Sequence, residues 1–262
     1  MKKDSREGQH VIRPYGDTVG DGFIQLAFTL PVENGAKARK AAQLYASKLN
    51  LFEVSVVHSQ KLSENFTYFV VYGKASVDLD YDSVVASEVK TGVTGFYEIN
   101  RLIKEEVKRV LSVVGATIGS DAHTVGIDAI INMKGYNQDY GLERYPQLNA
   151  INMGAQVSSE SLVKKAVECK ADAILVSQTV TQKDSHIRNF TELVELLEAE
   201  GIRDRFLLIA GGARVNHELA IELGYDAGFG PETLPSQVAA FIVENFLLKR
   251  RERGNEAEIA DE

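Results

Sequence analysis

Residues 111–126 read LSVVGATIGSDAHTVG, a largely apolar run followed by a loop of small and polar residues. A short apolar run of this kind predicts a strand that is buried on both faces, as the strands of parallel sheets are. Ligands of open parallel sheets bind beyond the carboxyl ends of the strands, so binding chemistry is expected in the loop that follows residue 118. A nucleotide-binding loop at this place would carry Gly-x-Gly-x-x-Gly, whereas this loop carries Asp121-x-His123-x-x-Gly126.

The sequence around this loop alternates between short apolar runs and amphipathic segments. Further strands are predicted at residues 150–153, 173–176, 206–210 and 225–228, and helices at 98–110, 161–169, 190–200, 217–223 and 235–248. Alternation at this spacing predicts a parallel sheet that is covered by helices on both faces. We therefore expect a five-stranded, doubly wound, Rossmann-like α/β domain over residues 91–253 and an acidic, frayed tail over 254–262.

The N-terminal part of the chain has a different rhythm. A polar, glycine-bearing arm is expected over residues 1–22. A small α+β domain is expected over residues 23–90, with β-α-β-β order: strands at 23–30, 52–58 and 66–72, and a helix at 36–49. A sheet of three strands leaves edges that invite a partner.

Composition excludes several classes of protein. The 262 residues are 44% hydrophobic and 25% charged, as in an ordinary globular protein. A net charge of -8 argues against a binder of nucleic-acid backbones, which needs a basic face. We find no apolar run of membrane-spanning length and no secretory signal at the start, so a cytoplasmic protein without membrane contact is expected. Cys169 is the only cysteine, which excludes an intrachain disulfide and a zinc finger or cysteine-ligated cluster within this chain.

The pair Asp121 and His123 has a chemistry of its own. A carboxylate that orients an imidazole raises the basicity of the free ring nitrogen, which suits a metal ligand or a general base. Gly126 permits a bulky group to approach the start of the following helix closely. From these residues alone, an Asp–His pair that only satisfies the loop backbone stays an open alternative.

The loop resembles the signature of cobalamin-binding domains that hold their cofactor base-off. The resemblance implies that His123 is the lower axial ligand of cobalt and that the nucleotide tail of the cofactor enters the domain beside the sheet. Three further elements stand in the expected order after later strands: Ser177-Gln178-Thr179, Gly211-Gly212 and the loop with Gly230. The sequence departs from the family pattern at Thr179, where leucine is usual, and in a longer spacing between Gly126 and Ser177. The cofactor-binding residues implied by the resemblance are Asp121, His123, Thr124, Gly126, Ser177, Thr179, Gly211, Gly212 and Gly230.

A lysine after this loop indicates which family of cobalamin-binding proteins the chain resembles. Local chemistry predicts that the helix opened by Thr124 ends at Gly135, so Lys134 would meet the helix dipole in the last turn. The stretch Asn132-Met133-Lys134-Gly135, at this distance from His123, resembles the small subunits of lysine 5,6-aminomutases. The resemblance implies that Lys134 forms a Schiff base with pyridoxal 5′-phosphate. If residues 124–134 are mostly helical, Lys134 lies roughly 15 Å from the His123 loop, and we hypothesise that substrate releases Lys134 so that the cobalamin domain can move.

The same resemblance implies a reaction and partners. Adenosylcobalamin and pyridoxal 5′-phosphate would together drive a radical 1,2-amino shift on D-lysine or L-β-lysine, giving a diaminohexanoate. A large barrel subunit would enclose the amino acid substrate, and the N-terminal domain would join two copies, giving a heterotetramer.

Three other functions fit these residues less well. A corrinoid carrier for methyl transfer would have no use for Lys134. A cobalamin-responsive regulator would need a DNA-binding segment or a basic face. In ornithine aminomutases the cobalamin domain belongs to a much longer chain. Several side chains stay ambiguous between packing or structural roles and contact with a cofactor or substrate: Tyr136, Tyr140, His186 and His217.

Overall fold

The computed structural model describes residues 10–260 except 17, 19, 86, 87, 93 and 94, with the backbone alone for 252–260. The chain divides into two compact units, residues 1–86 and 87–262. No helix within the described residues is both long and apolar enough to cross a bilayer.

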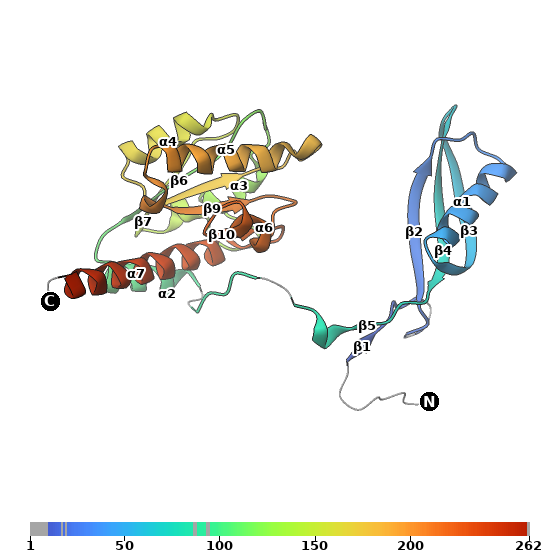
Figure 1. The fold of residues 1–262 in the computed structure, drawn as a ribbon, viewed down its shortest axis with the longest axis horizontal. Helices are drawn as coiled ribbons and strands as arrows, with labels where there is room; N and C mark the ends of the chain where they lie inside the picture. Colours follow the sequence, from blue (N-terminus) through green and yellow to red (C-terminus); the bar gives the residue numbers. More distant parts are fainter. Residues whose placement is uncertain (1–9, 17, 19, 86–87, 93–94, 261–262) are drawn as a thin grey trace. The chain divides into compact units, whose positions relative to one another are not determined.

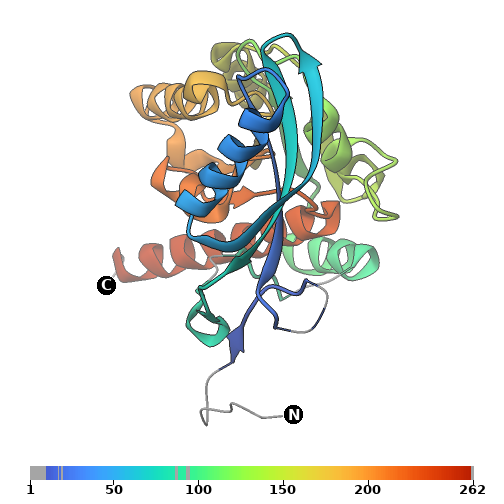
Figure 2. The same ribbon diagram turned by 90° about the vertical axis from the view of Figure 1, so that its right-hand side faces the viewer.

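The N-terminal unit is an antiparallel sheet with one helix on it. Its elements are β2 (Phe23–Leu30), α1 (Ala36–Lys48), β3 (Leu51–Ser63) and β4 (Phe66–Ala75), and the strand order is β2-β4-β3. Alanines at helical spacing bury one stripe of α1 against Phe69 and Val71, so α1 crosses one face of the sheet (Figures 1 and 2). The predicted β-α-β-β order is confirmed, although β3 extends beyond the predicted 52–58 and its pairing with β4 contains register shifts.

The described part of the N-terminal arm contains a short strand that was not predicted. β1 (Val11–Ile12) pairs antiparallel with β5 (Leu79–Asp80), and η1 (Tyr81–Ser83) follows. The backbone N–H of Tyr81 donates to the carbonyl of His10 at 2.8 Å. These bonds come from a segment far along the chain, so local polarity could not reveal them. Residues 1–9 of the predicted arm lie outside the described residues.

The C-terminal unit contains the predicted parallel sheet. Its strands follow the order β10-β9-β8-β6-β7, and each pairs in parallel: β6 (Leu111–Thr117), β7 (Leu148–Asn152), β8 (Ala173–Ser177), β9 (Leu207–Gly211) and β10 (Ala227–Phe229). Every residue of β6 is buried, as the apolar run predicted. The chain runs from β6 to β7 on one side and continues at β8 on the other. The carboxyl ends of β6 and β8 therefore flank the point of the sheet where ligands bind.

Helices cover both faces of this sheet. One core contains side chains from α2 (Phe96–Leu102), α3 (Val125–Ile131) and α7 (Pro235–Ala260). The other contains side chains from α4 (Ser159–Glu168), α5 (Ser185–Ala199) and α6 (His217–Glu222). Figure 1 shows α4 and α5 on one side of the strands and α2 and α7 on the other. The doubly wound five-stranded architecture is thus confirmed.

The ends of several helices differ from the predictions, among them those of α2 and α7. α2 passes into a π-helical turn, η2 (Ile103–Val107), which ends at left-handed Lys108 and keeps Ile99, Ile103 and Val107 on one buried face. The backbone of α7 stays helical to Ala260, so the prediction of a frayed tail from residue 254 was wrong for the described part.

Candidate functional site

Asp121 and His123 form a tight pair in the loop after β6. The side chain of Asp121 is 1% exposed, whereas that of His123 is 58% exposed. Oδ1 of Asp121 lies 2.8 Å from Nδ1 of His123 and accepts the backbone N–H of the same residue at 3.0 Å. Because an ionised carboxylate can only accept, Nδ1 carries the proton, and the lone pair of the imidazole lies on Nε2. The pair therefore presents an oriented nitrogen ligand to solvent.

The other oxygen of Asp121 ties this loop to the end of β8. Oδ2 accepts the backbone N–H groups of Thr179 at 2.6 Å and Val180 at 2.9 Å. Burial alone would raise the pKa of Asp121, but the hydrogen bonds from Val180, His123 and Thr179 outweigh it and leave the pKa below its ordinary value. Asp121 is therefore ionised at neutral pH, as a partner of Nδ1–H must be.

A buried polar network behind the loop holds it in place. Gln178 is buried; its amide donates to the carbonyl of Ile118 at 2.6 Å and accepts from Asn189 at 2.9 Å. The hydroxyl of Thr117 donates to the carbonyl of His123 at 3.0 Å. Sequence reasoning missed Asn189 and Val180 and gave Gln178 no role of its own. A glutamine directly after the buried strand β8 was the available signal for Gln178.

A cavity of about 360 Å³ opens beside this loop. It lies between α3, the ends of β8 and β9, and the loop after β10, and its walls include Val125, Ile130, Leu175, Ile209 and Phe229. The volume is in the range of small-molecule sites. Predicted binding residues that line it are Gly126, Ser177, Thr179, Gly211, Gly212 and Gly230. Asp121, His123 and Thr124 lie in the adjoining loop and do not line the cavity.

Two glycines of the cavity wall lie close to residues at the end of β8. A Cβ atom added to Gly126 would lie 2.7 Å from Oγ of Ser177, and one added to Gly212 would lie 2.1 Å from the carbonyl oxygen of Gln178. A larger residue at position 126 would displace the hydroxyl of Ser177, and one at position 212 would require the backbone at Gln178 to move. The cavity, its glycine wall and the exposed Nε2 of His123 together fit a large cofactor that carries a metal at one end.

Lys134 lies in a turn of its own and not in the last turn of a helix. α3 ends at Ile131, because Asn132 adopts an extended conformation with φ -61° and ψ 143°. The predictions that the helix reaches Lys134 and that Gly135 closes it were wrong, and the helix-dipole role and the estimated 15 Å spacing no longer apply. Gly135 has φ +69°, and a Cβ atom there would lie 1.8 Å from the carbonyl oxygen of Asp139. Lys134 is exposed at the start of this turn.

Comparison with known proteins identifies the family. The B12 binding domain model matches residues 111–239, and the model of the dimerisation domain of D-ornithine 4,5-aminomutase matches residues 11–88. The lysine 5,6-aminomutase β subunit of Acetoanaerobium sticklandii is 54% identical over 89% of this chain and 89% of that protein. The chain belongs to the lysine 5,6-aminomutase β-subunit family. This confirms the resemblance drawn from Asp121-x-His123-x-x-Gly126 and Lys134.

Two further relatives are less similar to this chain. The D-ornithine 4,5-aminomutase subunit β of Acetoanaerobium sticklandii is 33% identical over 95% of this chain but only 32% of that protein. Trimethylamine corrinoid protein 1 of Methanosarcina acetivorans is 27% identical over 66% of this chain and 74% of that protein. The corrinoid proteins of methyl transfer are therefore distant relatives.

The structure separates the four side chains whose roles the sequence left ambiguous. Tyr136 lines the cavity. Tyr140 packs against Phe96 with ring centroids 5.2 Å apart and lies under the guanidinium of Arg144. His217 accepts the backbone N–H of Gly228 at 3.4 Å, which supports a structural role. Nδ1 of buried His186 has no hydrogen-bond partner within the described residues.

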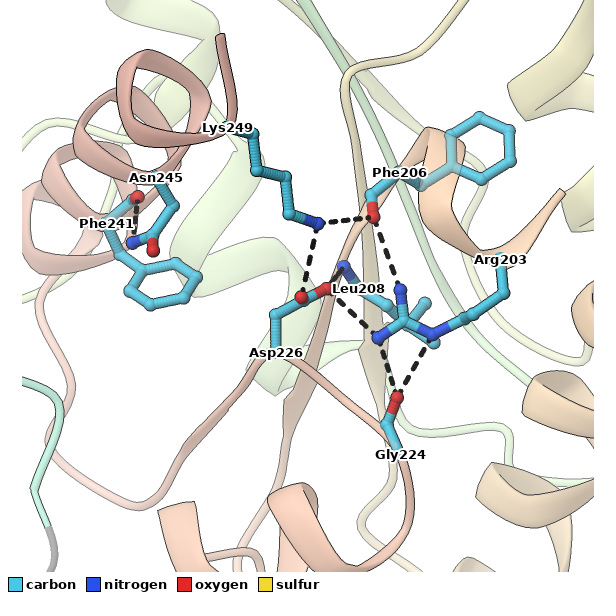
Figure 3. A network of polar contacts seen from close by, with 8 residues as sticks. All are labelled: Arg203, Phe206, Leu208, Gly224, Asp226, Phe241, Asn245 and Lys249. Carbon is cyan, nitrogen blue, oxygen red and sulfur yellow. Dashed lines mark hydrogen bonds and ion pairs between the residues drawn. The ribbon is translucent and has the colours of Figure 1, made fainter. Parts of the chain in front are cut away.

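A second polar network lies at the opposite ends of the strands (Figure 3). Asp226, directly before β10, accepts from the backbone N–H of Leu208 at 2.7 Å and from the guanidinium of Arg203 at 3.0 Å. Lys249 of α7 reaches the same carboxylate at 3.3 Å. Because this network is at the amino ends of β9 and β10, we assign it to joining α7 to the sheet and not to ligand binding.

Proposed function

We propose that this chain is the cobalamin-carrying subunit of a lysine 5,6-aminomutase that acts on D-lysine or L-β-lysine with adenosylcobalamin and pyridoxal 5′-phosphate. The observation that carries the proposal is the oriented, exposed Nε2 of His123 beside a glycine-walled cavity. When bound, adenosylcobalamin supplies the organic radical and pyridoxal phosphate carries the migrating amine.

Different residues of this site would bind different parts of cobalamin. His123 would be the lower ligand of cobalt, and Asp121 would fix its tautomer. Thr124, directly before α3, would also contact the cofactor. The cavity walls would enclose the nucleotide tail through Gly126, Ser177, Thr179, Gly211, Gly212 and Gly230.

Lys134 is the residue proposed to hold pyridoxal phosphate. Its side chain is exposed, and no hydrogen bond or ion pair of its ammonium group occurs among the described residues. No internal contact of this amine therefore has to be broken before it reaches a cofactor. A methyl-transfer carrier, the alternative that the distant corrinoid relatives favour, needs no such lysine.

We infer two partners from the same family. A large barrel subunit would enclose the amino acid substrate, since the walls of the described cavity are assigned to the nucleotide tail of the cofactor. The N-terminal unit would join two copies of the chain into a heterotetramer. In that unit α1 covers one face of the sheet, while Val57 and Tyr72 on strands β3 and β4 stay exposed.

The absorption spectrum of the complex with its large partner tests this function. In the wild type we expect a band near the visible edge from the lysine-linked cofactor, and in Lys134→Ala its replacement by the spectrum of the free aldehyde. Lys164→Ala, which removes an exposed lysine of α4, is the matched control and should leave the band unchanged. Identical spectra in the wild type and Lys134→Ala would reject Lys134 as the attachment point and favour a cobalamin carrier.

A further inference from the structure

Both the nitrogen and the oxygen of the side-chain amide of Asn152, the last residue of β7, form hydrogen bonds. Its Nδ2 donates to Oδ1 of Asp128 at 2.7 Å and to Oδ1 of Asn132 at 2.9 Å. Its Oδ1 accepts the backbone N–H of Gly154 at 2.9 Å. These three bonds fix the orientation of the amide, because a flipped amide would face the Gly154 N–H with a donor and the Asp128 carboxylate with an acceptor.

One side of Asn152 holds the segment that carries Lys134. Asp128 and Asn132 are four residues apart, so one amide bridges the last turn of α3 and the residue at which the helix ends. The next residue is held as well, since the backbone N–H of Met133 donates to the carboxylate of Glu143 at 2.9 Å. Lys134 follows these two anchored positions directly.

The other side of Asn152 reaches the loop of His123. The carbonyl of Gly154 accepts the backbone N–H of Thr117 at 2.8 Å, at the end of the strand that leads into this loop. Two residues further on, the backbone N–H of Gln156 donates to the carbonyl of Asp121 at 3.1 Å. The segment after β7 is therefore bonded to one cofactor loop by its backbone and to the Lys134 segment by the side chain of Asn152.

We propose that Asn152 is a positioning residue that fixes Lys134 relative to His123. This inference rests on the proposed function, in which Lys134 holds pyridoxal phosphate and His123 holds cobalt. Only an amide meets all three partners: an aspartate would lose both donors and place a second carboxylate against Asp128, and an aliphatic side chain would leave each partner unsatisfied.

Two experiments on the complex with the large subunit test the proposal: reductive trapping of the cofactor on Lys134, and a double substitution that exchanges the amide and carboxylate of Asn152 and Asp128. Borohydride reduction of the cofactor-loaded complex, followed by mass spectrometry of the Lys134 peptide, measures the fraction of Lys134 linked to pyridoxal phosphate. Asn152→Asp should lower this fraction about tenfold at limiting cofactor, the scale of coupling between contacting residues. In the double variant Asn152→Asp/Asp128→Asn the hydrogen bond between the two side chains re-forms with its direction reversed, and the fraction should recover. Asn149→Asp, at an exposed position of the same strand, adds the same charge and should resemble the wild type.

A second measurement distinguishes a specific effect on the position of Lys134 from a general disruption of the site. The nitrogen splitting in the electron paramagnetic resonance spectrum of the Co(II) form reports His123 coordination and should persist in Asn152→Asp. Asn152→Ser, which shortens the side chain without adding charge, gives the same comparison if Asn152→Asp does not fold. Equal labelling of Lys134 in the wild type and both Asn152 variants would overturn the inference while leaving the proposed function intact. A loss of labelling in Asn152→Asp that the double variant does not restore would have the same meaning. Absence of label on Lys134 in the wild type would overturn the proposed function itself, and this inference with it.

Discussion

At the scale of single residues, Asp121 decides what His123 can do. The carboxylate keeps the proton of the imidazole on Nδ1 and leaves Nε2 free. Asp121→Asn should present an amide N–H to Nδ1 and favour the tautomer with the proton on Nε2. We expect the affinity of His123 for cobalt to fall about tenfold or more, the usual loss when an outer partner of a metal-ligating histidine is removed. The nitrogen splitting of the Co(II) form measures this, with His123→Ala as the variant that loses it completely; unchanged splitting in Asp121→Asn would show that the pair is only structural.

Asp121 also contributes to the response of the unit to acid. Its pKa is lowered on folding, so its contribution to stability is present above its ordinary pKa of 3.8 and is lost as the pH falls through the lower pKa of the folded state. The amide that replaces this carboxyl group in Asp121→Asn cannot titrate. We therefore expect the difference in unfolding free energy between the wild type and Asp121→Asn to be larger at pH 7 than at pH 3. Urea unfolding at the two pH values measures it, and a constant difference would contradict the prediction.

The Asp–His pair could be predicted because its two residues lie close together in the sequence. The other partners of the same carboxylate, the N–H groups of Thr179 and Val180, come from the end of a different strand. The buried bond between Gln178 and Asn189 likewise requires a strand end and a helix to meet. Such contacts depend on tertiary packing, which periodicity does not reveal.

At the scale of elements, the strands were predicted better than the helix ends. A buried strand is recognised by its apolar run, but a helix stops where side chains from elsewhere compete for its last turn. α3 ends at Ile131, and the side chain of the next residue, Asn132, is bonded to Asn152 of β7. Gly141 packs so closely that a Cβ atom there would lie 1.8 Å from the carbonyl oxygen of Asn132. Glycine at position 135 suggested a helix end, whereas its positive φ serves the tight turn after Lys134.

The attachment of α7 to the sheet depends on Asp226. Its carboxylate accepts from Leu208 of β9, Arg203 and Lys249 of α7 (Figure 3). Asp226→Ala would leave the backbone N–H of Leu208 without its acceptor and the largely buried guanidinium of Arg203 without its counter-charge, so we expect a loss of about 2–4 kcal/mol in unfolding free energy. Asp226→Asn keeps an acceptor for Leu208 and should lose less. Urea unfolding measures both, and cobalamin affinity should stay unchanged because the network is at the other ends of the strands; a parallel loss of affinity would show that α7 supports the site.

At the scale of the whole molecule, the chain consists of two units with separate cores. The core of the N-terminal unit contains α1, β3 and β4 residues, whereas the two cores of the C-terminal unit contain only residues beyond position 88. Asp121, His123 and every residue that lines the cavity belong to the C-terminal unit. The family model for dimerisation matches residues 11–88, within which the N-terminal unit lies almost completely. In the proposed function, cofactor binding and association of two copies therefore belong to different parts of the chain.

This separation predicts the behaviour of a truncated chain. A variant that begins at residue 88 keeps both cores of the parallel sheet and the whole described cobalamin site, so we expect it to fold and to bind cobalamin with the affinity of the full chain. It lacks the three-stranded sheet with its exposed edges and uncovered face, so it should sediment as a monomer under conditions in which the full chain sediments as a dimer. Analytical ultracentrifugation and cobalamin titration measure the two properties independently. A truncated chain that remained dimeric would move the interface into the C-terminal unit, and a folded truncated chain without cobalamin affinity would show that the N-terminal unit completes the site.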